Sequence, residues 1–445
     1  MDRHFENAIS QAAPAAPAAP NLGFPTSGNP AAAIPATSPG AWWFYAITEE
    51  MRNAILAAGI DPEFASTNQL AAALLKIKDD HDASDAAHPD IRELIWRNSG
   101  GTAQIKKLDN RRPCLEKTGA TTLAIKAGTC AFLPAGEIYF PTATAADIAS
   151  LTPGEDYSVW VLPDGTACAI ADSIPYPAEE PAEGALKIGG FHYGLTAPGS
   201  TMAGGSFAVT GQGMIWTQDD VDLIAGINAH SIWDLTFRPL CDPRGMTCVT
   251  DPTGRGLFWF DIYFCGTDHV TLGTSRYNSD VASGTVLPKI PPMFGGDGTV
   301  KYTRLSTYEA LEIAMAHGKR LWKPSEFYAA AFGVTEKQSL GGASTTIPAT
   351  TRLPGYTSRY GGEQMTGHHW AYGDAQSFLS INVTGNWQAD PGRGSAIYGP
   401  SYCILGGSRE YGSNSGSRCS VWNYPAWNSY WTNGVRAVCD HLNLI

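Results

Sequence analysis

Residues 186–445 combine frequent glycine and tryptophan with short strand-like runs, and only two stretches carry the signals of a helix. One predicted helix covers residues 217–228, with Thr217 as its cap. The other covers residues 306–317, where Ser306 is the cap, Glu309 follows three residues on and Gly318 lies just past the end. The pattern predicts an α+β domain that is rich in loops.

Composition narrows the possible functions. The 445 residues include 30 basic and 42 acidic side chains, and the net charge of -12 would repel nucleic acid and anionic lipid. No run approaches the roughly 20 apolar residues of a membrane-spanning helix, and residues 1–10 lack the apolar core of a signal peptide. We therefore expect a soluble protein, made in a cytoplasm, with no nucleic-acid partner and no membrane insertion.

The chain divides into four predicted segments. Residues 11–40 are mostly Ala, Pro, Ser and Gly, which predicts an extended arm or linker. Residues 118–174 alternate apolar and polar residues between Gly, Pro and Asp turns, which predicts a small antiparallel β domain. The predicted domains are an arm (1–40), a helical segment (41–113), a small β domain (114–185) and the loop-rich domain (186–445).

Apolar residues recur at helical spacing on both sides of a break at Gly59. They form two stripes: Met51, Ile55 and Leu56, then Leu70, Leu74, Leu75 and Ile77. The aromatic residues Trp42, Trp43 and Tyr45 at the start would be exposed in a monomer. The pattern predicts a short helical hairpin that packs against copies of itself, and we expect a homotrimer.

Histidine and cysteine spacing indicates no metal or redox site. His81 and His88 could meet on a threefold axis, but solvated or stacked histidines are the simpler interpretation, and we predict no metal and no cofactor. Nine cysteines without CxxC spacing favour buried thiols over a zinc site or a full disulfide framework. A loop disulfide between Cys241 and Cys248 is the alternative that stays open.

The most informative stretch is residues 407–434. It holds 6 Ser, 4 Asn, 3 Tyr, 3 Trp and 4 Gly, with Glu410 as its one carboxylate and no lysine. Tyr and Trp supply contact area at small entropic cost, while Ser, Asn and Gly supply adaptable hydrogen bonds, as in antibody binding loops. The composition favours a recognition surface; the alternative is a loop region that covers the core, with Trp422 and Trp427 as anchors.

The closing motifs resemble a known family. They are Leu405-Gly406-Gly407-Ser408, Gly416-Ser417-Arg418 and Gly434-Val435-Arg436-Ala437-Val438-Cys439-Asp440. With the upstream segments 188–193, 233–235, 319–327 and 367–373, they are similar to the formylglycine-generating-enzyme type of C-type lectin fold. The resemblance is strongest to its retroelement-diversified variable proteins, among which are phage major tropism determinants. It implies a C-type lectin domain and recognition of a surface receptor.

A second resemblance lies near the start. Segments 23–25, 39–42, 47–55, 57–60 and 68–74 are similar to a region common near the beginning of phage tail-fibre proteins. This resemblance implies a virion tail fibre of a phage or prophage, made in the bacterial host cytoplasm. It also implies that the N-terminal segment attaches to phage tail or baseplate proteins.

The family resemblance also implies site residues, because its variable positions lie between fixed glycines and arginines. The residues that would face the ligand are Ser408, Glu410, Tyr411, Ser413, Asn414, Val421, Asn423, Tyr424, Ala426, Asn428, Tyr430 and Trp431. The residues that would form the scaffold are Gly412, Gly416, Arg418, Trp422, Pro425, Gly434 and Arg436. The expected partner is a bacterial surface receptor, either protein or glycan.

Three other functions compete with receptor binding. The same fold includes an oxidase with paired cysteines, but Cys403, Cys419 and Cys439 do not fall where that pair belongs. A fibre-borne hydrolase of host polysaccharide needs two carboxylates that flank a groove, and the available pairs are Asp219 with Asp220 and Asp261 with Asp268. A cellular lectin-like adhesin is disfavoured, because the N-terminal segment resembles phage tail fibres and no signal peptide is evident. We predict a receptor-binding protein without catalytic residues.

Overall fold

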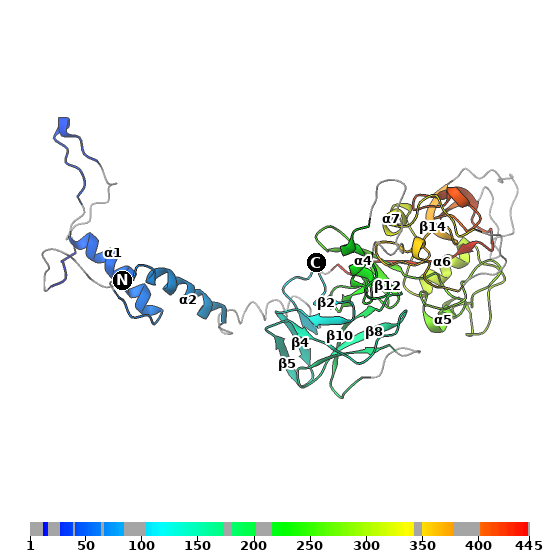
Figure 1. The fold of residues 1–445 in the computed structure, drawn as a ribbon, viewed down its shortest axis with the longest axis horizontal. Coiled ribbons are helices and arrows are strands. Elements are labelled where there is room, and N and C mark those ends of the chain that lie inside the picture. The colour runs from blue at the N-terminus through cyan, green and yellow to red at the C-terminus, as the bar shows by residue number, and fades with distance from the viewer. Residues whose placement is uncertain are drawn as a thin grey trace. The chain divides into compact units, whose positions relative to one another are not determined.

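The computed structural model describes residues 12–16, 27–38, 41–63, 66–83, 104–172, 180–201, 216–341, 349–377 and 401–443, and the side chains of 78–83 are not part of that description. The chain forms two compact units, Met1–Thr102 and Ala103–Ile445 (Figure 1). In the predicted arm, the described residues include one short 3-10 turn, η1 (Pro30–Ala32). The side chains of His81 and His88, the pair considered for a metal, lie outside the described residues.

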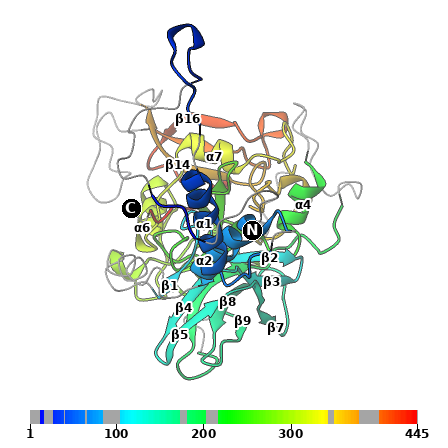
Figure 2. The ribbon, with the colours of Figure 1, turned by 90° about the vertical axis from the view of Figure 1, so that its left-hand side faces the viewer.

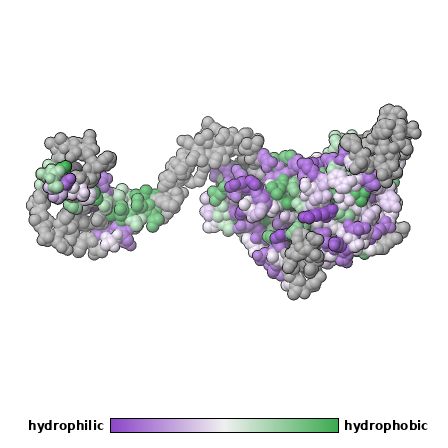
Figure 3. All heavy atoms as spheres, turned by 90° about the horizontal axis from the view of Figure 1, so that it is seen from above, coloured by the Kyte–Doolittle hydropathy of each residue, from purple (hydrophilic) through white to green (hydrophobic). Residues whose placement is uncertain are grey.

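The first unit contains two helices, α1 (Ala41–Ala57) and α2 (Gln69–Ala83), as the apolar spacing predicted. Gly59 has a φ of +69° just after α1, a conformation that L side chains rarely adopt. Ile55, Ala58 and Ala73 form a small core between the helices. Figure 3, in which hydrophobic residues are green, shows that this unit also presents such residues on its surface. The exposed ones are Trp43, Phe44, Leu56, Leu74, Leu75 and Ile77.

The second unit begins with short strands in three sheets, which confirms the predicted β domain. One sheet has the order β1-β4-β5, from β1 (Ile105–Lys106), β4 (Thr129–Leu133) and β5 (Gly136–Phe140). Another has the order β2-β3-β6, from β2 (Leu115–Gly119), β3 (Thr122–Ile125) and β6 (Thr144–Ala145). The largest has the order β11-β10-β8-β9-β7, from β7 (Asp147–Ile148), β8 (Asp156–Val161), β9 (Ala167–Ala171), β10 (Leu186–His192) and β11 (Trp233–Asp234).

The β domain extends beyond residue 185, because strand β10 belongs to its largest sheet. It pairs antiparallel with β8, and its residues Ile188 and Phe191 lie in the same apolar core as Val159 and Leu115. β11 pairs with the other edge of β10 at Gly189, where an added Cβ would collide with the backbone of β11. We propose that the β domain ends after β11 rather than at residue 185.

Two predicted helices are confirmed, one before β11 and one in the domain that follows it. Thr217 caps α4 (Gln218–Ile224), and Ser306 caps α6 (Thr307–Ala316), each through a capping box. α4 ends before residue 228 because Ala225 adopts an extended backbone. Helix α7 (Pro324–Ala330), which starts with a proline, was not predicted. The short elements are η3 (Ala229–Ser231), α5 (His269–Leu272), η4 (Pro292–Phe294), η5 (Pro354–Tyr356) and η6 (Gly412–Asn414).

Two sheets organise this domain, which confirms the α+β class. The first has the order β12-β13-β18, from β12 (Met246–Thr250), β13 (Gly256–Asp261) and β18 (Val438–Asp440). The second has the order β16-β15-β14-β17, from β14 (Trp370–Ser377), β15 (Ser401–Leu405), β16 (Ser420–Pro425) and β17 (Asn433–Gly434). Trp322, Phe327 and Leu405 are fully buried between these sheets and the helices. Figure 2 shows α7, β14 and β16 at the end of the second unit away from β5 and β9.

Candidate functional site

Two glycines turn the chain where β15 ends. Gly406 and Gly407 have φ values of +91° and +83°. An added Cβ at Gly406 would lie 2.8 Å from the Phe327 ring, and one at Gly407 would collide with Ser415. Only glycine fits both the backbone conformation and the space. The Gly-Gly motif therefore fixes the direction in which the following loop leaves the sheet.

Residues 336–339 hold this loop from the side. Ser339 Oγ donates to the Arg409 carbonyl at 2.8 Å and accepts from the Gly412 amide at 3.0 Å. Glu336 accepts from the amide of Ser417 at 2.9 Å and from its hydroxyl at 2.5 Å. None of these bonds uses the side chain of residue 410, 411, 413 or 414. The hydrogen bonds with Glu336 and Ser339 therefore do not require particular side chains at those four positions.

Most of the predicted ligand-facing residues have solvent-accessible side chains. The exposed ones are Glu410, Tyr411, Ser413, Asn414, Asn423 and Tyr430, and the half-buried ones are Val421, Tyr424, Asn428 and Trp431. Ser408 and Ala426 are fully buried. Ser408 forms a bridge with His368, and the Ala426 carbonyl accepts from the amide of Thr307 at the start of α6. These two residues face the interior, so we leave them out of the proposed surface.

Four of these residues, Tyr411, Tyr424, Tyr430 and Trp431, form what we term the aromatic face. Burial raises the pKa of Tyr424 to about 12, and the phenols of Tyr430 and Tyr411 act in the same direction. The rings of Tyr430 and Trp431 stack with centroids 6.4 Å apart. Tyr411 exposes 43% of its surface and Tyr430 exposes 52%. The four residues come from the loop after β15, from strand β16 and from the loop after β16.

Buried groups support the aromatic face from below. The guanidinium of Arg409 lies 5.3 Å from the Trp431 ring centroid, and the Trp370 ring meets Tyr411 edge-on at 4.9 Å. Arg409 and Trp370 are each only 2% exposed. Sequence reasoning missed both, because neither lies at a position that the family varies. They fix ring positions without contacting solvent themselves.

Trp422 differs from its predicted scaffold role, because 41% of its surface is exposed. It lies on β16, and its indole N–H donates to the Ser420 hydroxyl at 2.9 Å. The neighbouring Pro425 is buried, as expected of scaffold. The Trp422 ring is therefore available as additional contact area beside the predicted ligand-facing residues.

The two predicted scaffold arginines also differ from each other. Arg418 is exposed, whereas Arg436 is fully buried. The Arg436 guanidinium donates to the carbonyls of Asp261 at 2.8 Å and Ile262 at 2.5 Å, and also to that of Glu363. Burial lowers the pKa of Arg436 to about 9 and raises that of Glu363 to about 7. Arg436 thus cross-links the end of β13 to the segment that leads into β14, as a scaffold residue would.

The acids considered for catalysis have structural contacts. Asp220 caps α4 and pairs with Arg359 at 2.6 Å. Asp261 is fully buried and pairs with Lys319 at 2.6 Å, and Asp268 pairs with Lys289 at 2.7 Å. These three acids are held in ion pairs, whereas Asp219, the fourth acid considered, is exposed and lines an open groove together with Asp222.

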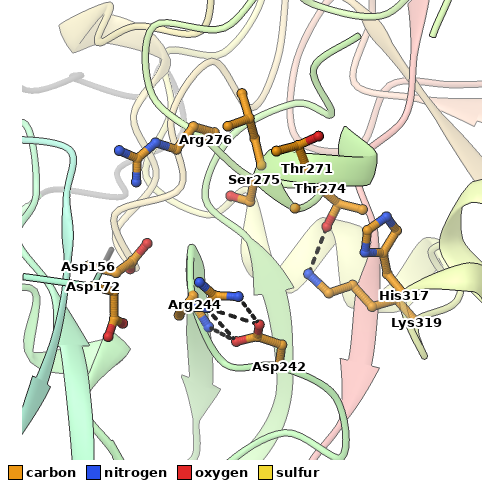
Figure 4. Close-up of a pocket in the computed structure, with 12 residues that line it drawn as sticks. Asp156, Asp172, Asp242, Arg244, Thr271, Thr274, Ser275, Arg276, His317 and Lys319 are labelled. Atoms are coloured by element: carbon orange, nitrogen blue, oxygen red, sulfur yellow. Dashed lines mark hydrogen bonds and ion pairs between the residues drawn. The ribbon is translucent and has the colours of Figure 1, made fainter. Parts of the chain in front are cut away.

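A small polar cavity of about 50 Å³ lies where the β domain meets the lectin-like domain (Figure 4). Asp156 on β8 lies 2.9 Å from His192 Nδ1 and accepts from the Gly245 amide at 3.0 Å. Arg244 is paired with Asp242, and Lys319 donates to Thr274 at 2.7 Å. Since these polar groups already satisfy one another, we interpret the cavity as part of the joint between the two domains.

In the described ranges of the chain, no three His, Cys, Asp or Glu residues are grouped so that they could bind a metal ion. Every helix within the same ranges is too short or too polar to cross a bilayer.

Comparisons with known proteins agree on one relationship. The family model described as the Mtd second domain matches residues 113–233. The tail fiber receptor-binding protein of Bordetella phage BPP-1 is 38% identical over 348 residues, which cover 76% of this chain and 84% of that protein. The solved structure of the Major Tropism Determinant M1 variant is 35% identical with a TM-score of 0.67, over 78% of this chain and 88% of that one. The U1 variant is 36% identical with a TM-score of 0.66, over 76% and 86%.

Proposed function

The chain belongs to the family of phage tail-fibre receptor-binding proteins that includes the major tropism determinants, and from this premise we propose that it attaches a phage to a bacterial surface receptor through the loops of residues 410–431. The aromatic face carries this proposal. Exposed Tyr and Trp rings on an otherwise weakly charged surface supply the contact area that dominates the energy of protein interfaces. The receptor is a protein or a glycan on the host cell.

We also propose that this surface is diversified, as in the retroelement-diversified proteins that the sequence resembles. In the loop, one set of residues fixes the backbone, and a different set of side chains is free to vary. Gly406, Gly407 and Arg436 shape the backbone, while Glu336 and Ser339 hold the loop by contacts that spare the side chains of residues 410, 411, 413 and 414. Changes at those four positions can therefore alter recognition without moving the scaffold.

We also propose that the chain acts by binding and not by catalysis. Three of the four carboxylates considered for hydrolysis, Asp220, Asp261 and Asp268, are held in ion pairs. The accessible surface of the aromatic face presents phenols, indole and amides, with Glu410 as the nearby acid. A lone carboxylate does not form the acid and base pair of a glycosidase.

A competition experiment tests attachment directly. Purified full-length protein, added to host cells before the phage that carries it, is expected to occupy the receptor and reduce phage adsorption at least about tenfold at saturation. The same protein after thermal unfolding serves as the control and should have no effect. Undiminished adsorption at saturating folded protein would contradict receptor binding by this chain.

The helical unit supports a proposal about assembly and location. Its exposed Trp43, Phe44, Leu74, Leu75 and Ile77 lie on two helices whose own core is small. Burying large apolar side chains between copies is favourable by about 1.5–3 kcal/mol for each side chain. We infer that this unit forms a homotrimer and joins the fibre to tail or baseplate proteins of the virion, after synthesis in the host cytoplasm.

Light scattering of the intact chain is expected to give the mass of three copies. Replacing Leu74 and Leu75 on α2 by Ser should shift the protein toward monomer, because those side chains lose their apolar area. Leu108→Ser is the matched control, since Leu108 is 87% exposed in the other unit and should leave the mass unchanged. A monodisperse monomer of the wild-type chain at micromolar concentration would rule out the trimer.

A further inference from the structure

Cys241 and Cys439 lie opposite each other on neighbouring extended segments. Pro239 pairs antiparallel with His441, and the pair is framed by hydrogen bonds from Leu240 N to Asp440 O and from Leu442 N to Arg238 O. Continued for two residues, this register would place Cys241 opposite Cys439. Opposed residues between the hydrogen-bonded pairs of an antiparallel ladder have Cα atoms about 4.5 Å apart, within the roughly 4.4–6.8 Å that a disulfide spans.

Direct contacts agree with this register. The amide of Cys241 donates to Cys439 Sγ at 3.3 Å, although the two residues are 198 positions apart in the chain. Cys241 is half-buried and lines an open groove of about 530 Å³ together with Trp233, Leu235 and Leu240. A small oxidant can therefore reach the pair from solvent, even though Cys439 itself is buried.

We propose that Cys241 and Cys439 form a disulfide bond once the protein has left the reducing cytoplasm of the host. The oxidant is a low-molecular-weight disulfide such as oxidised glutathione. A thiolate of the pair attacks it and one glutathione thiolate leaves; the second cysteine then loses its proton and attacks the mixed disulfide. Two electrons pass from the pair to the oxidant, which departs as two glutathione thiols, and the Sγ–Sγ bond remains.

The electrostatics of the pair favour this reaction. The hydrogen bond with the Cys241 thiol lowers the pKa of Cys439 to about 7, and the backbone amides of Cys241 and Leu240 and the charge of Lys319 act in the same direction. Thiol–disulfide exchange is fastest when the attacking thiol has a pKa near the ambient pH. By contrast, the hydrogen bond with Cys439 raises the pKa of the Cys241 thiol, so Cys439 supplies the thiolate of the pair. Burial raises the pKa of the Cys168, Cys248 and Cys265 thiols.

The structure disfavours the sequence-based alternative of a Cys241–Cys248 loop disulfide. Cys248 pairs with Trp259, and Trp259 pairs with Cys439 on its other side, so Cys248 and Cys439 flank the same tryptophan. The buried Cys248 thiol donates to the carbonyl of Val249. Cys241 instead contacts Cys439 along the edge of β18 that does not pair with β13.

The disulfide would link β18, the strand that follows the binding loops, to the segment that contains Cys241. β18 begins two residues after Arg436 and is the last strand of the lectin-like domain. Linking it to residue 241 closes a long loop, which removes much of the conformational freedom of the unfolded chain. A receptor-binding domain displayed outside the cell thereby gains resistance to unfolding.

Oxidation of the full chain with oxidised glutathione, followed by thiol alkylation and non-reducing peptide mapping, tests the proposal. We expect one Cys241–Cys439 peptide, with the other cysteines alkylated, and a melting temperature raised by roughly 5–10 °C that dithiothreitol reverses. Cys241→Ser should abolish both the linked peptide and the shift, whereas Cys168→Ser, at another half-buried thiol, should retain both.

Two outcomes of the wild-type peptide map would overturn the proposal, and neither needs a folded variant. One is full alkylation of all nine cysteines after oxidation. The other is a bond that joins Cys241 or Cys439 to a different cysteine.

Discussion

Replacing Tyr411 and Tyr430 together by Ala is expected to abolish attachment to host cells while changing the melting temperature by no more than about 2 °C. Both rings are about half exposed. Hydrogen bonds from the backbone amides hold Gly412 and Ser417 in the loop of Tyr411, and the carbonyl of Tyr430 accepts from the Gly284 amide, so none of these bonds uses either tyrosine side chain. Large aromatic residues at the centre of an interface often contribute at least about 2 kcal/mol each, so the double variant should lose on the order of 100-fold to 1000-fold in affinity. Adsorption of the purified protein to host cells measures the loss.

Tyr139→Ala supplies the matched control for this experiment. Tyr139 lies on β5 in the β domain and is 53% exposed, close to the 52% of Tyr430. The substitution removes the same side chain at the same exposure, and attachment should stay at the wild-type level. Equal loss of attachment in the Tyr139 variant would mean that aromatic exposure in general, rather than the aromatic face, governs adsorption.

Replacing Arg436 by Ala should have the largest effect on stability. The fully buried guanidinium donates to the carbonyls of Asp261, Ile262 and Glu363, and it lies 4.4 Å from the Phe264 ring centroid. Its loss leaves three buried carbonyls without that donor and opens a cavity, and breaking a buried charged contact costs about 3–5 kcal/mol. Chemical denaturation should show this decrease in the free energy of unfolding.

Arg418→Ala is the control for the arginine experiment. Arg418 is exposed, and surface substitutions usually change stability by less than about 0.5 kcal/mol. Arg436→Lys should remain strongly destabilised, because an ammonium cannot reproduce the flat fork of donors that reaches three carbonyls. A free energy of unfolding that is unchanged in the Arg436→Ala variant would contradict the cross-linking role.

Local signals in the sequence predicted much of the fold. The caps at Thr217 and Ser306 set the starts of two helices, and apolar spacing around Gly59 set the helical pair of the first unit. The Gly-Gly motif before the binding loop could also be identified, because glycine is needed wherever φ is strongly positive and space is short. Each of these features depends on residues close in the sequence.

Features that depend on distant residues could not be predicted. Burial of Ser408 and Ala426 follows from contacts with His368 and Thr307, and no local pattern reveals those contacts. The same holds for the support of Trp431 by Arg409, and for Cys241 meeting Cys439 across 198 positions. Composition indicated the binding loop as a whole, but tertiary packing decides which of its side chains face solvent.

Adsorption and thermal unfolding, measured side by side for the Tyr411→Ala/Tyr430→Ala and Arg436→Ala variants, test the binding face most directly. We expect the tyrosine variant to lose attachment and keep its melting temperature. We expect the arginine variant to lose stability first, and attachment only in proportion to the unfolded fraction. A tyrosine variant as unstable as the arginine variant would show that those rings belong to the core, and the proposed binding face would then be misplaced.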